Sequence, residues 1–108
     1  MTPTFVYITC ASADEAARIG TALVEARLAA CVNILDGMRS LYWWQGKVEA
    51  GQETVMIAKT RDSLLDALTR RVKALHSYEC PCVVAFPVQA GNPDYVAWIG
   101  AETEGARA

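Results

Sequence analysis

Ligands suited to a soft metal ion gather in the segment HSYECPC, which spans residues 76–82. It contains His76, the only histidine of the chain, together with Cys80 and Cys82, two of its four cysteines. Two thiolates and one imidazole so close in the sequence are able to bind Cu(I) or Zn(II). In an extended segment the two thiols would face the same side, with Cα atoms about 6.6 Å apart. That separation is near the upper limit for a disulfide, so a bond between them would be strained.

Two other interpretations of this segment stay open. One is a plain turn between a helix and a strand, in which His76 binds the last carbonyl groups of the helix and Pro81 prevents the helix from continuing. The other is a redox pair of Cys80 and Cys82. The turn is the principal interpretation, metal binding comes second and the redox pair third.

Three residues outside this segment have a chemistry that depends on where the fold places them. Cys10 is expected between a strand and a helix, where the helix N-terminus favours the thiolate and makes it a further candidate ligand. Cys31, in ACVNIL, is interpreted as a small core residue, since free cysteine is often buried. Lys59, in VMIAKT, is expected either at the sheet edge in solvent or in a pocket with Glu53 or Glu79 as its partner.

Motifs of the common enzyme classes are absent from the sequence. It contains no GxGxxG, no GxxxxGK, no nucleophile elbow and no paired zinc-ligand motif. A serine-type triad would have to use His76, and the sequence places no Asp and Ser partners beside it. We therefore predict no catalytic residues.

The composition argues against some classes of binding partner. The formal net charge is −2, which argues against general attraction to nucleic acid or to an anionic membrane. No apolar run approaches the roughly 18 residues of a membrane span, and the N-terminus lacks the pattern of a secretory signal. We expect a cytoplasmic protein with reduced thiols. The apolar fraction of 53% is slightly high and favours burial of some surface against another subunit.

Periodicity predicts alternating strands and helices in the first half of the chain. TFVYIT has the β-branched and aromatic residues of a strand. Ser12 and Glu15 then form the pattern of a capping box, and apolar residues at helical spacing continue to about Leu28. A hairpin follows around Gln45-Gly46, and Asp36-Gly37 indicates a bend or bulge in its first arm. The arms are expected at residues 30–44 and 47–60.

The second half has the same alternation. The segment DSLLDALTRRVKALH predicts a helix capped by Asp62 or Ser63, with one apolar stripe. The stripe consists of Leu64, Leu68, Val72 and Leu75. CVVAFPV predicts a strand, and Asn92 with Pro93 predicts the start of a short last helix. The tail from Thr103 is expected to fray.

The order of these elements is β-α-β-β-α-β followed by a terminal helix. It predicts an α+β, ferredoxin-like fold with an antiparallel sheet, formed by one domain over residues 1–108. Two helices cover only one face of such a sheet, so the terminal helix or a neighbouring subunit is expected on the other.

The predicted hairpin also predicts self-association. Its arms are longer than the usual strand of 5–6 residues, and its first arm ends in Leu41, Tyr42, Trp43 and Trp44. Unpaired strand edges that carry apolar rings are prone to aggregation. We therefore expect a closed homo-oligomer in which the hairpin pairs with another copy.

Five segments together identify a resemblance to a known family. ACVNI, SLYWWQGK, MIAKT, HSYECP and GNPDYVAWI resemble, in order and spacing, the signature segments of the CutA family of divalent-cation tolerance proteins. The resemblance covers about Tyr7 to Ile99 and is specific as a set. It implies a ferredoxin-like homotrimer with hairpins paired between subunits, and a role in tolerance to divalent cations, copper above all.

The resemblance also implies a copper site. Cys10 and His76 correspond to the copper ligands described for the family. Leu75 stands where the family has a further histidine, and Cys82 stands where it usually has glutamate. The thiol of Cys82 can compensate for the lost imidazole, so the expected metal ligands are Cys10, His76 and Cys82.

A second set of residues follows from the same resemblance. The family's recurring polar and aromatic positions correspond to five residues expected to line a cleft between subunits, namely Trp44, Glu53, Lys59, Tyr78 and Glu79. The leading function is copper binding and tolerance without catalysis. The alternative is a regulatory trimer of the PII plan that binds a small ligand in this cleft. An acylphosphatase-type enzyme and an RNA-binding sheet are both disfavoured, the first by the lack of arginine in CASADE and the second by the net charge.

Overall fold

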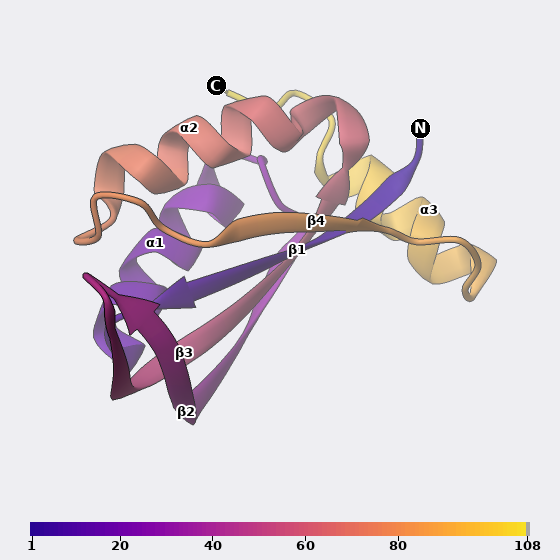
Figure 1. Cartoon of the computed structure of the whole chain (residues 1–108). Coiled ribbons are helices and arrows are strands. Elements are labelled where there is room, and N and C mark those ends of the chain that lie inside the picture. The colour runs from indigo at the N-terminus through magenta and orange to yellow at the C-terminus, as the bar shows by residue number, and fades with distance from the viewer. Residues whose placement is uncertain (108) are drawn as a thin grey trace.

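The computed structural model describes residues 1–107 and contains, over that range, one sheet of four strands with three α-helices (Figure 1). A short 3₁₀-helix precedes the second α-helix. The elements in chain order are β1 (Pro3–Cys10), α1 (Ala13–Glu25), β2 (Cys31–Trp44), β3 (Lys47–Arg61), η1 (Asp62–Leu64), α2 (Leu65–Leu75), β4 (Val83–Pro87) and α3 (Pro93–Glu102).

The sheet has the strand order β2-β3-β1-β4, and each neighbouring pair is antiparallel. Helices α1 and α2 lie together on one face of it (Figure 1). Alternate residues of β1 and β3 point toward these helices because side chains of a strand alternate between faces. The fully buried core includes Val6, Ile8, Met56 and Ala58 from the strands and Ile19, Leu23, Leu68 and Val72 from the helices. The predicted α+β, ferredoxin-like plan is thereby confirmed.

The hairpin of β2 and β3 has the predicted turn and the predicted bulge. Gln45 and Gly46 both have positive φ, 49° and 79°, as the tight turn of a twisted hairpin requires. The pairing register shifts between Leu35 and Met38. At that point Asp36 Oδ1 accepts hydrogen bonds from the Gly37 N–H at 2.8 Å and from the Thr54 hydroxyl at 2.9 Å. The bulge therefore adds one residue to β2 and is fixed by a side chain.

The outer half of the hairpin is exposed within this chain. Leu41 and Trp43 have 79% and 75% of their surface accessible, and Tyr42, Trp44 and Val48 are exposed as well. The inner half of β3 pairs with β1, and α1 packs against the inner halves of both β2 and β3. The apolar surface that the sequence predicts on the hairpin is therefore present and uncovered in a single chain.

Helix α1 begins as predicted and ends earlier. Ser12 is its N-cap, and the Ser12 hydroxyl accepts from the Glu15 N–H at 3.1 Å. The predicted end near Leu28 is three residues too long, because Arg27 adopts a left-handed φ of 58°. The Leu28 N–H then binds the Leu23 carbonyl at 2.9 Å, which is the closing bond of a Schellman motif.

The cap predicted for α2 is wrong. Asp62 Oδ1 accepts from the N–H groups of Thr2 and Ser63, so it ties β1 to the 3₁₀ turn. The residue before α2 is Leu64, whose side chain makes no capping bond. The apolar stripe itself is confirmed, with Leu68 and Val72 fully buried and its two end residues packed against the core.

Helix α3 starts as predicted, with the Asn92 side chain accepting from the Asp94 N–H at 3.1 Å. The frayed tail is wrong for the described residues. Thr103 is buried and its hydroxyl donates to the Ile99 carbonyl at 2.8 Å. Arg107 binds the end of α1 through its N–H, which donates to the Ala26 carbonyl at 2.8 Å. The C-terminal segment is therefore held against α1.

Helix α3 reaches the sheet face that α1 and α2 leave open. Its Tyr95 hydroxyl lies 3.0 Å from Lys59 Nζ, and Lys59 alternates along β3 with the buried Ala58 and Thr60. The cover is partial. Leu35, Val84 and Phe86, on the same face, stay exposed.

Candidate functional site

Three side chains with metal-ligand atoms meet at one end of the sheet. They are Cys10 at the end of β1, Glu15 in the first turn of α1 and His76 directly after α2. One ligand atom from each lies within 4.8 Å of the others. The segment 76–82 is also the predicted turn between a helix and a strand, because α2 ends at Leu75 and β4 begins at Val83.

The imidazole of His76 is fully buried and uses both of its ring nitrogens. Nε2 lies 2.7 Å from the Thr9 carbonyl oxygen, and Nδ1 accepts from the Tyr78 N–H at 2.9 Å. Since Nδ1 faces a donor, the hydrogen of the neutral ring is on Nε2, which donates to Thr9. The predicted bond from this side chain to the last carbonyls of its own helix is wrong, because only the His76 backbone N–H binds α2, at the Val72 carbonyl.

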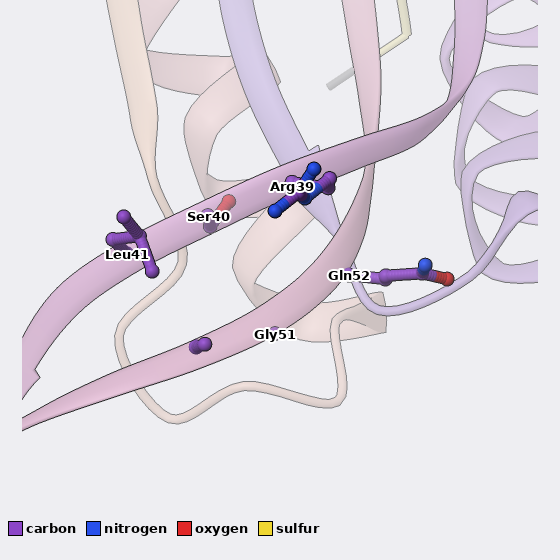
Figure 2. Close-up of a pocket in the computed structure, with 6 residues that line it drawn as sticks. Arg39, Ser40, Leu41, Gly51 and Gln52 are labelled. Carbon is purple, nitrogen blue, oxygen red and sulfur yellow. The ribbon is translucent and has the colours of Figure 1, made fainter.

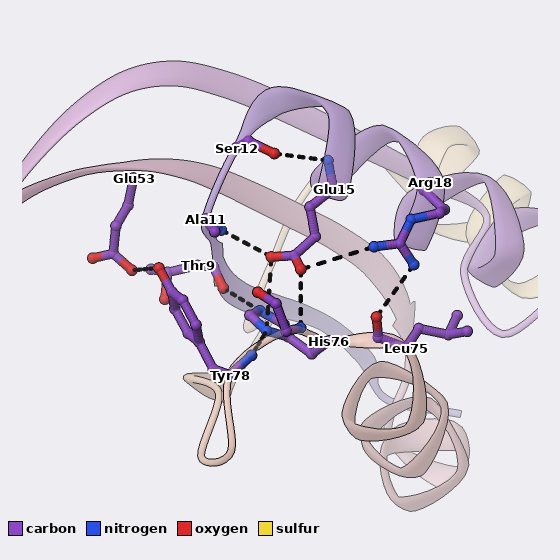
Figure 3. Close-up of polar contacts among 10 residues, drawn as sticks. Thr9, Ala11, Ser12, Glu15, Arg18, Glu53, Leu75, His76 and Tyr78 are labelled. Atoms are coloured by element: carbon purple, nitrogen blue, oxygen red, sulfur yellow. Dashed lines mark hydrogen bonds and ion pairs between the residues drawn. The ribbon is translucent and has the colours of Figure 1, made fainter.

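Glu15 links three segments through its carboxylate (Figure 3). Oε1 accepts from the Ala11 N–H and Oε2 from the Ser77 N–H, both at 2.9 Å. Arg18 Nη2 lies 3.8 Å from Oε2. Burial opposes ionisation of Glu15, yet the hydrogen bonds from Ala11 and Ser77 outweigh it, so the pKa of the carboxyl is lowered.

Sequence reasoning recognised Glu15 only as part of a helix cap and missed its place in this cluster. In a capping box the glutamate returns to the N-cap residue's own N–H. Here the carboxylate bonds instead to the residue before the N-cap and to the turn after α2. A capping pattern beside a candidate ligand such as Cys10 was the available signal.

Cys10 has no accessible surface. Burial, followed by the negative charge of Glu15, raises the pKa of its thiol to about 11. The thiolate expected from a position before a helix N-terminus is therefore wrong, because loss of hydration and a nearby carboxylate outweigh the helix dipole. The thiol is protonated at neutral pH.

The donor set nevertheless suits a soft or borderline metal ion. A thiolate, an imidazole and a carboxylate are ligands of zinc and of copper. Binding an ion here requires that Cys10 lose its proton. It also requires that His76 give up one of its two hydrogen bonds, since a ligating nitrogen needs a free lone pair. The residues fit a metal ion by chemistry and by proximity, and the network must open to receive it.

Cys82, the third ligand expected from the sequence, is not among the three clustered side chains. Its carbonyl oxygen accepts from the Thr9 N–H at 3.4 Å, which continues the β1–β4 pairing by one residue beyond Ile8 and Val83. Because side chains alternate along a strand, this register directs Cys82 to the face opposite Cys10. Glu15 holds the third position of the cluster.

Of the five residues expected in a cleft, Tyr78 and Glu53 are bonded to each other within the chain. The Tyr78 hydroxyl donates to Glu53 Oε2 at 2.9 Å (Figure 3). Burial and this neighbouring carboxylate raise the pKa of Tyr78 to about 12. Trp44 ends β2 at the hairpin turn, and Glu79 is exposed in the turn after α2. Lys59 is on β3, six residues beyond Glu53, where it contacts neither of the two glutamates expected as its partners.

A hollow of about 490 Å³ lies along the outer hairpin (Figure 2). Its lining consists of Arg39, Ser40 and Leu41 from β2 and Ala50, Gly51 and Gln52 from β3. None of the candidate ligands contributes to it. Over residues 1–107, no helix is both long enough and apolar enough to cross a membrane.

Comparison with known proteins agrees with this fold and these motifs. The family described as "CutA1 divalent ion tolerance protein" matches residues 4–102. The Oryza sativa "Protein CutA 1, chloroplastic" is 47% identical over 94 residues, which is 87% of this chain and 53% of that protein. This chain thus spans about half the length of the rice relative. The Archaeoglobus fulgidus "Divalent-cation tolerance protein CutA" is 45% identical over 100 residues, 93% of this chain and 97% of that protein.

Solved structures show the same likeness in three dimensions. The crystal structure of CutA1 from Oryza sativa has a TM-score of 0.94 at 42% identity and covers 98% of this chain and 97% of its own. The periplasmic divalent cation tolerance protein CutA from Archaeoglobus fulgidus has a TM-score of 0.92 at 44% identity, with coverage of 94% and 99%. The family match over residues 4–102, the sequence identities and the shared fold lead to one conclusion: this chain belongs to the CutA1 divalent ion tolerance protein family.

Proposed function

We propose that this protein contributes to divalent-cation tolerance by binding copper at the cluster of Cys10, Glu15 and His76. The observation that carries the proposal is the proximity of the three ligand atoms, all within 4.8 Å. A buried thiol and an imidazole favour a soft or borderline ion over Mg²⁺ or Ca²⁺, which prefer oxygen ligands. Cys82 remains the predicted additional ligand, and it would have to turn toward the cluster from the other sheet face.

Binding at this cluster is coupled to the turn that follows α2. A metal ion on Nδ1 of His76 would displace the Tyr78 N–H, which donates to that nitrogen at 2.9 Å. Tyr78 is also bonded to Glu53 on the hairpin. Copper binding would therefore move the turn that follows α2. Because Tyr78 of this turn is bonded to Glu53, the hairpin would also move at Glu53.

We also propose that the working form is a cytoplasmic homotrimer in which hairpins pair between subunits. Support comes from the exposed strand pair Met38–Trp44 and Lys47–Glu53, with Leu41 and Trp43 accessible over most of their surface. An isolated chain would leave this surface and its strand edges in water. The protein acts by binding, without a catalytic step.

A second candidate function is a regulatory trimer that binds a small ligand in a cleft between subunits. Two features of the open sheet face favour it. One is the Tyr78–Glu53 hydrogen bond, and the other is the half-buried cation of Lys59 farther along the same strand. This candidate requires no metal.

Competitive titration tests the copper proposal. Cu(I) is added to reduced protein in the presence of a coloured Cu(I) chelator, and the ion withdrawn per chain is measured. Cys10→Ser and His76→Gln should each weaken binding by about a hundredfold or more, since each removes one ligand. Cys31→Ser is the matched control, because Cys31 lies on the other sheet face beside Lys59.

The same experiment assigns the remaining ligands and can overturn the proposal. The titration is repeated with Glu15→Gln and with Cys82→Ser. Weaker copper binding in the first variant indicates a carboxylate ligand, and weaker binding in the second indicates a second thiolate. A large change in the amide NMR signal of Tyr78 upon addition of Cu(I) is expected, because its N–H loses its acceptor. Unchanged affinity in both Cys10→Ser and His76→Gln would exclude this cluster as the copper site.

A further inference from the structure

Lys59 lies in a row of side chains that crosses the open face of the sheet. Phe86 of β4 is paired with Phe5 of β1, Phe5 with Lys59 of β3, and Lys59 with Cys31 of β2. All four point away from α1 and α2. From α3, Tyr95 reaches over this row, with its hydroxyl oxygen 3.0 Å from Lys59 Nζ.

Aromatic rings surround the ammonium group on two sides. Lys59 Nζ is 5.4 Å from the centre of the Phe5 ring and 5.3 Å from that of Tyr95. Both distances are in the range of a cation–π contact. The hydrogen bond with Tyr95 raises the pKa of Lys59, burial acts in the opposite direction, and Cys31 adds to the increase. Lys59 is therefore firmly cationic at neutral pH.

This cation lacks a counter-ion within the described part of the chain. The ion pairs of residues 1–107 involve Arg18, Arg27 and His76, and none involves Lys59. A half-buried charge is normally paired, because removing it from water is costly. One N–H of the ammonium group is used by Tyr95, which leaves others available.

Two further groups are oriented to assist Lys59. The Tyr95 oxygen accepts from Lys59, so its own hydrogen is directed to another acceptor, either the Cys31 sulfur or an oxygen of a ligand. The Cys31 sulfur lies 3.7 Å from that oxygen. Beside them the Trp98 ring stands 5.6 Å from the Tyr95 ring at 31°, and Trp98 and Phe86 are both substantially exposed. A cation and a hydroxyl donor thus border an exposed aromatic surface.

We propose that Lys59, Tyr95 and the adjoining rings form a site for a small organic anion that carries a planar ring. The anionic oxygen binds the Lys59 ammonium and the Tyr95 hydroxyl, and the ring packs on Phe86 or Trp98. The anionic group is a carboxylate or a phosphate. The site lies on the face opposite Cys10, so it goes beyond the copper proposal and gives the second candidate function a ligand class.

Calorimetric titration with matched probes tests the ligand class. Benzoate is compared with acetate, which lacks the ring, and with benzyl alcohol, which lacks the charge. Adenosine monophosphate is compared in the same way with inorganic phosphate and adenosine. At least one ringed anion should bind saturably and more tightly than both of its partial counterparts, and the better of the two anions identifies carboxylate or phosphate as the preferred group.

Substitutions locate the site. Lys59→Gln and Tyr95→Phe should each weaken the bound anion, the first by about tenfold or more because a charge-assisted hydrogen bond is lost. Lys59→Arg keeps the charge and should retain part of the affinity, so a folding defect of one variant does not decide the result. Lys47→Gln, on the exposed hairpin, is the control and should leave binding unchanged.

Three outcomes would overturn the proposal. The first is the absence of saturable binding by either ringed anion, and the second is equal binding by the wild type, Lys59→Gln and Tyr95→Phe. The third is a smaller assembly mass for Lys59→Gln, which would show that a carboxylate of a second copy is the partner of Lys59. Cys10→Ser should keep anion binding intact, so failure of the copper proposal and failure of this one are distinguishable.

Discussion

The Nε2 atom of His76 lies 2.7 Å from the carbonyl oxygen of Thr9, the residue directly before Cys10. This bond joins the turn after α2 to the end of β1 across 67 positions of the chain. It also fixes the ring so that Nδ1 faces the Tyr78 N–H. The position of the only histidine is therefore set by backbone groups before any ligand arrives.

Loss of the His76 ring should destabilise the metal-free protein. His76→Ala leaves the Thr9 carbonyl and the Tyr78 N–H without partners and creates a cavity, at a cost of about 2–4 kcal/mol. Urea unfolding in the presence of a chelator, at fixed protein concentration, measures the change. Arg70→Ala, at an exposed position of α2, is the control and should stay within about 0.5 kcal/mol. Equal stability of wild type and His76→Ala would show that the network contributes nothing.

Glu15 should make stability sensitive to acid. Its pKa is lowered in the folded state, so its contribution is fully present above the unfolded value, near 4.5, and is lost as pH falls through the folded value. Glu15→Gln keeps the shape but weakens acceptance from Ala11 and Ser77, at a cost of about 1–3 kcal/mol at neutral pH. The free energies of unfolding of the two proteins should therefore converge as the pH is lowered from neutral to acid. A difference in unfolding free energy between the two proteins that stays constant with pH would contradict the role of the carboxylate charge.

Copper affinity should increase with pH. The Cys10 thiol, whose pKa is raised to about 11, is protonated at neutral pH and must release its proton when it binds an ion. Apparent affinity should then rise by about tenfold per pH unit between about pH 6 and pH 8. Chelator competition at several pH values measures the slope. Cys10→Ser should make the copper affinity less dependent on pH, whereas Cys31→Ser should leave the pH dependence of the wild type unchanged.

Tyr78 should ionise only at unusually high pH. The chain has four tyrosines, and burial with the Glu53 carboxylate raises the pKa of Tyr78 to about 12. Absorbance of the phenolates during alkaline titration should show one late step, absent in Tyr78→Phe. Glu53→Gln should move this step toward the ordinary value near 10. A titration curve whose late part is the same in wild type and Tyr78→Phe would contradict the buried hydrogen bond.

A charge on the outer hairpin should reduce the size of the assembly. Trp43→Glu and Leu41→Glu put a carboxylate on side chains that are exposed in one chain and that we propose to be covered by another copy. Sedimentation should show a lower mass for both variants than for the wild type. Ala17→Glu, on the exposed side of α1, introduces the same charge elsewhere and should keep the wild-type mass. An unchanged mass in the hairpin variants would exclude this surface as the interface.

Local chemistry made most of the fold predictable from sequence. Ser12, Gln45-Gly46, Asn92 and the bulge at Asp36-Gly37 each have a residue type that satisfies a specific backbone geometry. The end of α1 was missed because Arg27, instead of glycine, adopts the left-handed conformation. Asp62 was misjudged because its partner, Thr2, lies 60 positions away. Distant contacts of this kind leave no local pattern.

The same limit explains the candidate site. Cys10 and His76 were recognisable as ligand types, and the structure brings them together. Glu15 was hidden because its helix-cap pattern already accounted for it, while its second partner, Ser77, lies on another element. Cys82 is near His76 in the chain, but strand alternation directs it to the opposite face. Closeness in sequence was thus a poor guide to closeness in space.

The added residue at the bulge has a consequence for how this hairpin tolerates insertions and deletions. Leu35 pairs with Val55 and Met38 with Glu53, so three steps on one arm match two on the other. Removing one residue there would restore one-to-one pairing with Met38 still opposite Glu53, so the side chains beyond it, including Trp43, would keep their faces. Arms lengthened by a matched pair on each side would keep their faces. A single-residue deletion should therefore be tolerated at the bulge, whereas elsewhere in β2 it would reverse the faces of the residues beyond it.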